Sequence, residues 1–155
     1  MFYIYFIFII LLVLIALWAG MWLYKIHAIM HSAQELFGKL IRLYDKRHEL
    51  LEKFINNKDF TSSAFSGNLS YIISKLSSSK QTKDIYEKLK IEHEISEAIK
   101  DFEFDRDIVV INEEVHKIVE EYNFLAEKLN SLSKKILVKS LFKVFKINLL
   151  NKIEV

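Results

Sequence analysis

The 155-residue chain contains no cysteine, no proline and only three glycines. Without cysteine it forms no disulfide or zinc–thiolate site and has no thiolate nucleophile. Because proline is absent and glycine is scarce, few residues would break or sharply turn a helix. Long helices are therefore expected.

Charge is absent from residues 1–24, and this segment is apolar on every face. A helix of this length rises about 36 Å, enough to cross a hydrocarbon core of about 30 Å. The rest of the chain is too short to bury such a helix easily, and no basic n-region or cleavage site marks a removable signal peptide. We predict a transmembrane anchor whose ends carry the interfacial aromatic residues Tyr3, Tyr5, Trp18, Trp22 and Tyr24.

Basic residues follow this anchor, and none precedes it. The positive-inside rule then predicts a protein of the cell membrane whose C-terminal part is cytoplasmic. Charge is also segregated: residues 25–58 carry seven basic and four acidic side chains, residues 84–121 carry five and thirteen, and residues 134–155 carry six lysines against one glutamate. Such blocks can order neighbouring helices and place basic surface near lipid.

Beyond the anchor, apolar residues recur at helical spacing. A first amphipathic helix is predicted over 25–57, a polar connector with a short helix over 58–84, and a long second helix with a basic amphipathic tail over 85–155. The predicted fold class is all-α, with the anchor continuing into a long antiparallel helical hairpin or a small helical bundle. A strand at residues 108–111, where four β-branched residues run together, is the less favoured alternative.

A charged island at residues 45–49 interrupts the first amphipathic helix. Lys46, Arg47 and Glu49 form a candidate interaction patch, in which the planar guanidinium of Arg47 could bind phosphate or carboxylate. The commoner interpretation of such an island is a solvated helix face.

The tail alternates lysines with apolar residues. The candidate membrane-surface contacts are Lys135, Lys139, Lys143 and Lys146, since a helix would place them opposite its apolar residues, as in segments that lie on anionic membranes. The alternative is a last helix that caps the core of the hairpin.

The histidines offer no clear chemistry. His27 and His31 share a helical face, but no further ligand completes a metal site. His93 and His116 have acidic sequence neighbours that point to other helical faces. No catalytic residue, metal or cofactor is predicted, and the acidic second helix argues against nucleic-acid binding.

The order of features resembles the LemA family of bacterial membrane proteins. The match includes Tyr24-Lys25 at the end of the anchor and the segment Leu43-Tyr44-Asp45-Lys46-Arg47-His48-Glu49-Leu50-Leu51. It continues through Asp105-Arg106-Asp107-Ile108, Tyr122-Asn123 and Leu141-Phe142-Lys143-Val144-Phe145. Glu52 stands where the family has proline, and His116 where it has its first asparagine.

The resemblance implies a non-catalytic, membrane-tethered helical domain that organises membrane or recruits other membrane or envelope proteins. A coiled-coil envelope or division component that forms homo-oligomers through its apolar stripes is the alternative.

Overall fold

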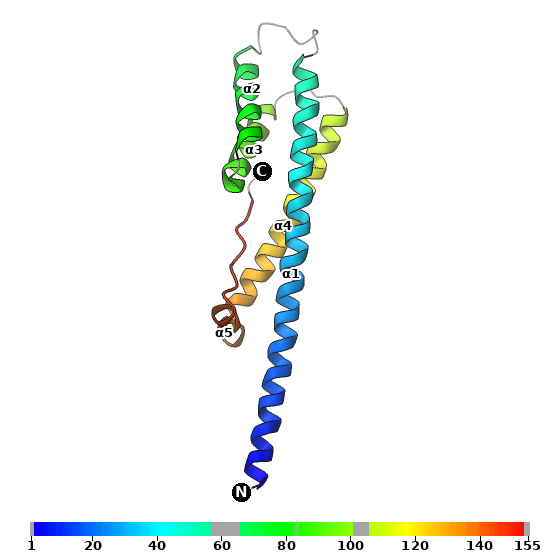
Figure 1. Ribbon diagram of the computed structural model, residues 1–155. Helices are drawn as coiled ribbons and strands as arrows, with labels where there is room; N and C mark the ends of the chain where they lie inside the picture. The colour runs from blue at the N-terminus through cyan, green and yellow to red at the C-terminus, as the bar shows by residue number, and fades with distance from the viewer. Residues whose placement is uncertain (1, 57–65, 83, 101–105, 154–155) are drawn as a thin grey trace. The chain divides into compact units, whose positions relative to one another are not determined.

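The computed structural model describes residues 2–56, 66–82, 84–100 and 106–153. Throughout these ranges the regular secondary structure is helical, which confirms the all-α prediction. The elements are α1 (Phe2–Asn56), α2 (Ser66–Gln81), α3 (Ile85–Ile99), α4 (Arg106–Ser133) and α5 (Ile136–Val144) (Figure 1). The β-branched run at 108–111 lies inside α4, so the strand alternative is not adopted.

Helix α1 joins the predicted anchor and the first amphipathic helix in one uninterrupted helix of 55 residues. It is long and apolar enough near its start to cross a membrane, and none of its most apolar 18 residues is buried. The chain after α1 forms more helices than the sequence predicted. Helix α2 occupies the connector where a short helix was expected, and α3, α4 and α5 follow where a long second helix with a basic amphipathic tail was predicted.

Helix boundaries have local causes. Asp84 caps α3, because its carboxylate accepts hydrogen bonds from the backbone N–H groups of Tyr86 and Glu87. Extended backbone at Lys135 separates α4 from α5. Lys146 adopts a positive φ of 49°, and the Ile147 N–H then bonds the Phe142 carbonyl, which closes the end of α5 in a Schellman-type turn.

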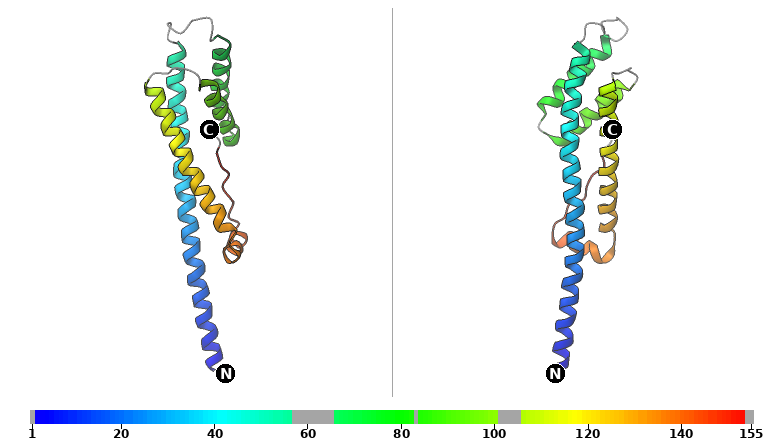
Figure 2. Two further views of the ribbon diagram at one scale, coloured as in Figure 1. Left: turned by 180° about the vertical axis from the view of Figure 1, so that it is seen from behind. Right: turned by 90° about the vertical axis from the view of Figure 1, so that its right-hand side faces the viewer.

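The chain divides into two compact units. The bundle unit is Leu36–Tyr122 with Ile153–Val155, and the anchor unit is Met1–Glu35 with Asn123–Lys152. In the bundle unit α2 packs against α3, side by side in both figures (Figure 2). One apolar cluster draws on four helices of this unit: Leu51, Ile72, Leu76, Ile91, Ile95, Ile99 and Ile108.

Helices α1 and α4 are antiparallel within the bundle unit. Leu51 and Ile108 belong to one apolar cluster, and the rings of Phe37 and Tyr122 lie 6.0 Å apart. Their chain order is therefore reversed between the two helices. The small helical bundle, one of the two predicted architectures, is the arrangement found in this unit.

The anchor unit contains a second core. Ile26 and Ile29 of α1 pack with Leu129 of α4 and with Val138 and Phe142 of α5. After α5 the chain returns in extended form along α4, where the Asn130 side-chain amide donates to the Leu150 carbonyl at 2.9 Å. Helix α5 is thereby held against two other elements of the same unit.

Candidate functional site

A buried cluster of charged and polar side chains lies at the centre of the bundle unit. Arg47 and His48 come from α1, Ser79 from α2, and Glu92 and Ser96 from α3. Arg47 is 1% exposed and Glu92 0% exposed, and His48 and Ser79 are equally enclosed. The cluster therefore joins three helices through polar contacts that are buried around Glu92 and partly buried at Ser96.

Glu92 is the acceptor at the middle of this cluster. Its Oε2 accepts from Nη2 of Arg47 at 2.5 Å, while Oε1 accepts from Ser79 at 2.5 Å and lies 2.7 Å from Nε2 of His48. The second guanidinium nitrogen of Arg47, Nη1, donates to Ser96 at 2.9 Å. Both carboxylate oxygens are thus engaged, as a buried charge requires.

Electrostatics keep this carboxylate ionised. Burial alone would raise the pKa of Glu92, but the His48 hydrogen bond, the Arg47 charge and the Ser79 hydroxyl together hold it below its usual value. The Arg47 guanidinium also lies 5.0 Å from the ring centroid of Tyr44. Burial raises the Tyr44 pKa to about 12, partly offset by the Arg47 charge, so its phenol is neutral at physiological pH.

The structure does not bring the three residues of the predicted interaction patch to one surface. Lys46 and Glu49 are exposed, whereas Arg47 points inward and binds a carboxylate of its own chain. The chemistry expected of the guanidinium is present, but its acceptor is internal. The other members of the cluster, His48, Ser79, Glu92 and Ser96, were not predicted.

A signal for this cluster does exist in the sequence. Arg47 and His48 fall between Tyr44 and Leu51 at the spacing of the apolar stripe, so they occupy positions that face the core. Glu92 is likewise three residues before Ile95, on the same face of α3. Charged residues in phase with an apolar stripe indicate a buried polar contact.

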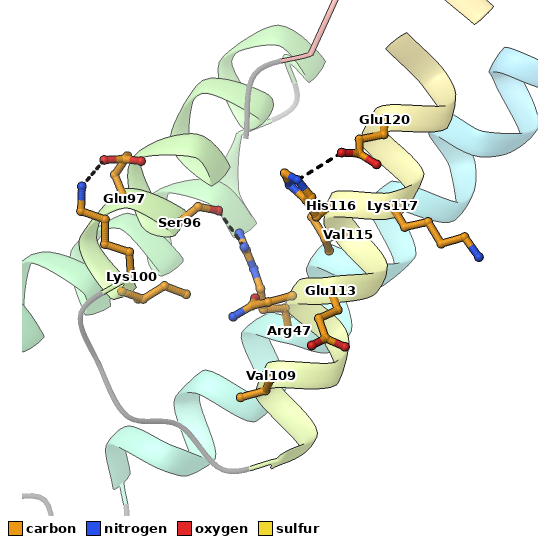
Figure 3. Close-up of a pocket in the computed structure, with 12 residues that line it drawn as sticks. Arg47, Ser96, Glu97, Lys100, Val109, Glu113, Val115, His116, Lys117 and Glu120 are labelled. Atoms are coloured by element: carbon orange, nitrogen blue, oxygen red, sulfur yellow. Dashed lines mark hydrogen bonds and ion pairs between the residues drawn. The ribbon is translucent and has the colours of Figure 1, made fainter. Parts of the chain in front are cut away.

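Beside the cluster, the surface of the bundle unit has an open cavity of about 600 Å³ between α3 and α4 (Figure 3). Arg47 and Ser96 form part of its wall. Its rim carries both signs of charge, with an ion pair between Lys100 and Glu97, and the His116 side chain lies 3.4 Å from the Glu120 carboxylate. This mixture does not select for either an anion or a cation.

The remaining histidines lie on helix surfaces. His31 pairs with Glu35 at 3.6 Å, and His116 pairs with Glu120 at 3.4 Å rather than with its acidic sequence neighbours. His27 is exposed on α1, and His93 is partly buried on α3. Among the residues that the structure describes, no three His, Asp or Glu side chains are grouped to hold a metal ion.

The four tail lysines are exposed in the anchor unit. Lys135 lies with its ammonium group 5.4 Å from the ring centroid of Trp22, and Lys25 approaches the same ring at 5.2 Å. Lys139 and Lys143 project from α5, and Lys146 lies in the turn that ends it. The buried face of α5 belongs to the second core, so α5 packs on the other helices as the alternative for this segment expected.

No protein-family model, curated protein or solved structure matches this chain. The resemblance to the LemA family therefore depends on the sequence motifs alone.

Proposed function

We propose that the chain is a non-catalytic, single-pass membrane protein whose helical domain organises membrane or recruits other membrane or envelope proteins. The observation that carries the proposal is α1, which begins as an uncharged, exposed apolar helix and continues without a break into a packed helical domain. A soluble protein would leave an apolar surface of this size in water, at a large cost in free energy.

The contacts and the burial of the polar cluster support the non-catalytic part of this proposal. Arg47, His48 and Glu92 are the kind of groups that enzymes use, but here Arg47 and His48 both lie against the Glu92 carboxylate inside the bundle. A catalytic acid or base must reach the proton that it transfers, and the two members of the cluster that could do so, His48 and Glu92, are fully buried. They are better suited to holding three helices together.

Orientation is part of the proposal. Lysine and arginine begin at Lys25, directly after the apolar segment, and favour a cytoplasmic domain. A LemA-like role agrees with this arrangement and rests on the motifs quoted above. The partners are the lipid bilayer and proteins of the same membrane or envelope.

Packing favours this proposal over a homo-oligomeric coiled coil. Most of the apolar stripe on α1 that would form a coiled-coil seam is covered by the chain itself: Ala33, Leu40, Tyr44 and Leu51 are buried, and Phe37 and Ile55 are partly buried. They are not available to a second copy unless the unit opens. Crosslinking of the full-length protein in membranes should yield monomers, whereas a ladder of multiples would favour the oligomer.

Membrane extraction tests the anchor. The wild-type protein should stay in membranes washed with alkaline carbonate, whereas Leu11→Lys/Leu14→Lys should be released. Each central lysine costs about 2.5–3.5 kcal/mol of insertion free energy. The matched variant Leu11→Ala/Leu14→Ala should stay in the membrane. Wild-type protein in the carbonate supernatant would overturn the proposal.

Reporter fusions test the orientation. A reporter that is active only in the cytoplasm should work when fused after the C-terminal residue. Activity only from a reporter that requires the outer compartment would show that the domain faces the other way.

A further inference from the structure

Helix α5 has two apolar sides, of which the fold covers one. Val138 and Phe142 pack into the core of the anchor unit. Leu137 and Val144, seven residues apart and hence on one face, are 70% and 73% exposed. The fold therefore leaves this second apolar face largely exposed.

Helix α5 lies near the end of the uncharged segment of α1. The buried side of α5 packs there against Trp18, Trp22 and Ile26. Tryptophan is enriched at the headgroup layer of membranes. The ammonium groups of Lys25 and Lys135 both approach the Trp22 ring, which places positive charge at this same level. If the anchor spans a bilayer, α5 lies at its surface.

Charge distinguishes the anchor unit from the chain as a whole. The chain carries a net charge of +2, but this unit holds eight lysines and two glutamates. The lysines are Lys25, Lys128, Lys134, Lys135, Lys139, Lys143, Lys146 and Lys152. Each lysine close to an anionic membrane surface contributes favourably to binding. The unit therefore complements negatively charged lipid.

Two of these lysines stand where the local fold disfavours them. Lys135 is at the N-terminus of α5, where the helix dipole favours negative charge. Lys146 adopts φ 49°, a conformation in which glycine would cost less. Nearby anions would compensate for the charge at Lys135.

We propose that α5 lies in the headgroup layer of the leaflet where the anchor ends, as a collar that binds anionic phospholipid. Leu137 and Val144 enter the outer acyl region, and the ammonium groups of Lys139, Lys143 and Lys146 contact lipid phosphates. The long lysine stems allow their charges to reach the headgroups while the apolar face is inserted. This inference rests on the proposed membrane anchor and adds the lipid class that the domain recognises.

Depth measurements on the full-length protein test the collar. Because the chain lacks cysteine, Val144→Cys gives a single attachment site for a nitroxide label. The label should be accessible to oxygen and shielded from a water-soluble nickel complex in vesicles containing phosphatidylglycerol. Val110→Cys on α4 of the bundle unit, also an exposed valine, is the matched control and should show the reverse.

Charge removal tests the lipid preference. In the labelled protein, Lys139→Gln/Lys143→Gln should lower the equilibrium constant for insertion by more than about tenfold, since each lysine near an anionic surface contributes about fivefold. Lys117→Gln, an exposed lysine of the bundle unit, should have no effect. In vesicles of phosphatidylcholine alone, the wild type and the double variant should behave alike.

Lys146→Gly separates a structural role from a lipid-binding one. Glycine relieves the positive φ, so the thermal unfolding midpoint should rise. The proposal also requires weaker insertion in anionic vesicles. A stabilised variant with unchanged insertion would show that this lysine has no part in lipid binding, which would overturn its place in the collar.

Three results would overturn the inference as a whole. A label at residue 144 as open to nickel as the label at residue 110, in protein that survives carbonate washing, would reject the collar and leave the anchor in place. A label shielded from both reagents, with crosslinks to a second copy, would show that protein covers this face. Release of the wild type by carbonate would reject the anchor and the collar together.

Discussion

Removing the negative charge of Glu92 should destabilise the bundle unit far more than removing an exposed charge of the same helix. Glu92→Gln keeps the shape of the side chain but leaves the Arg47 guanidinium buried without a counter-ion. The new amide group would also turn a donor toward groups that now face a carboxylate, whichever way it is oriented. Both effects act at a site sealed from solvent.

The magnitude follows from the burial of both partners. Removing one partner of a buried ion pair costs about 3–5 kcal/mol, against a total stability of about 5–15 kcal/mol for a typical domain. Glu97→Gln is the matched control, since Glu97 lies on the same helix and pairs with Lys100 on the surface. Exposed pairs of this kind contribute about 0–1 kcal/mol.

Hydrogen–deuterium exchange of the full-length protein in lipid nanodiscs measures the difference locally. A loss of about 3 kcal/mol should speed exchange of protected α3 amides by more than about 100-fold in Glu92→Gln. Exchange in Glu97→Gln should change by less than about tenfold. Equal exchange in the two variants would refute the argument that the Arg47–Glu92 pair holds the bundle together.

Acid should reproduce the substitution. Since the folded-state pKa of Glu92 lies below its ordinary value of 4.5, its ionised form stabilises the fold fully above that value. This contribution is lost as the pH falls through the folded-state pKa. The stability difference between wild type and Glu92→Gln should therefore be constant near neutral pH and shrink at pH values below 4.5.

Three further predictions concern packing, capping and titration. Ile95→Ala should cost about 2–5 kcal/mol in urea unfolding, because Ile95 is fully buried, whereas Ile73→Ala on exposed α2 surface should cost under about 1 kcal/mol; similar losses would refute the assignment of the core. Asp84→Ala should cost about 0.5–2 kcal/mol and speed exchange at the start of α3, and Asp84→Asn should retain most of the cap; no change in Asp84→Ala would contradict its capping role. Tyr44→Phe should leave the tyrosinate absorbance of the folded protein near pH 10 almost unchanged, since the Tyr44 pKa is raised to about 12; a clear loss would show that Tyr44 ionises normally.

Local signals in the sequence were sufficient for the helical class and for the anchor candidate. Apolar residues at a spacing of three and four predict a helix wherever they occur, and the uncharged first segment is distinct from everything after it. The boundaries within residues 85–155 were harder, since neither glycine nor proline marks them. Lysines flank α5 at both ends, Lys135 with extended backbone and Lys146 with a positive φ. The residue type lysine predicts neither conformation.

Long-range pairing was beyond sequence reasoning. Arg47 and Glu92 are separated by 45 residues, and no residue of the charged island indicates which carboxylate accepts the hydrogen bond of Arg47. The island was interpreted from its charge, while the phase of Arg47 with the apolar stripe carried the more useful information. The burial of Arg47 explains this pairing, because a guanidinium that faces the core is stable there only when a carboxylate neutralises its charge.

The Arg47–His48–Glu92 cluster also determines how α1 and α3 are aligned along their length. Leucines and isoleucines at helical spacing would pack almost as well if α3 slid by one turn, about 5.4 Å, along α1. Such a slide would separate Glu92 from both of its basic partners and leave three buried polar groups unpaired. Apolar contacts alone would permit several registers of this bundle, and the polar cluster selects one of them.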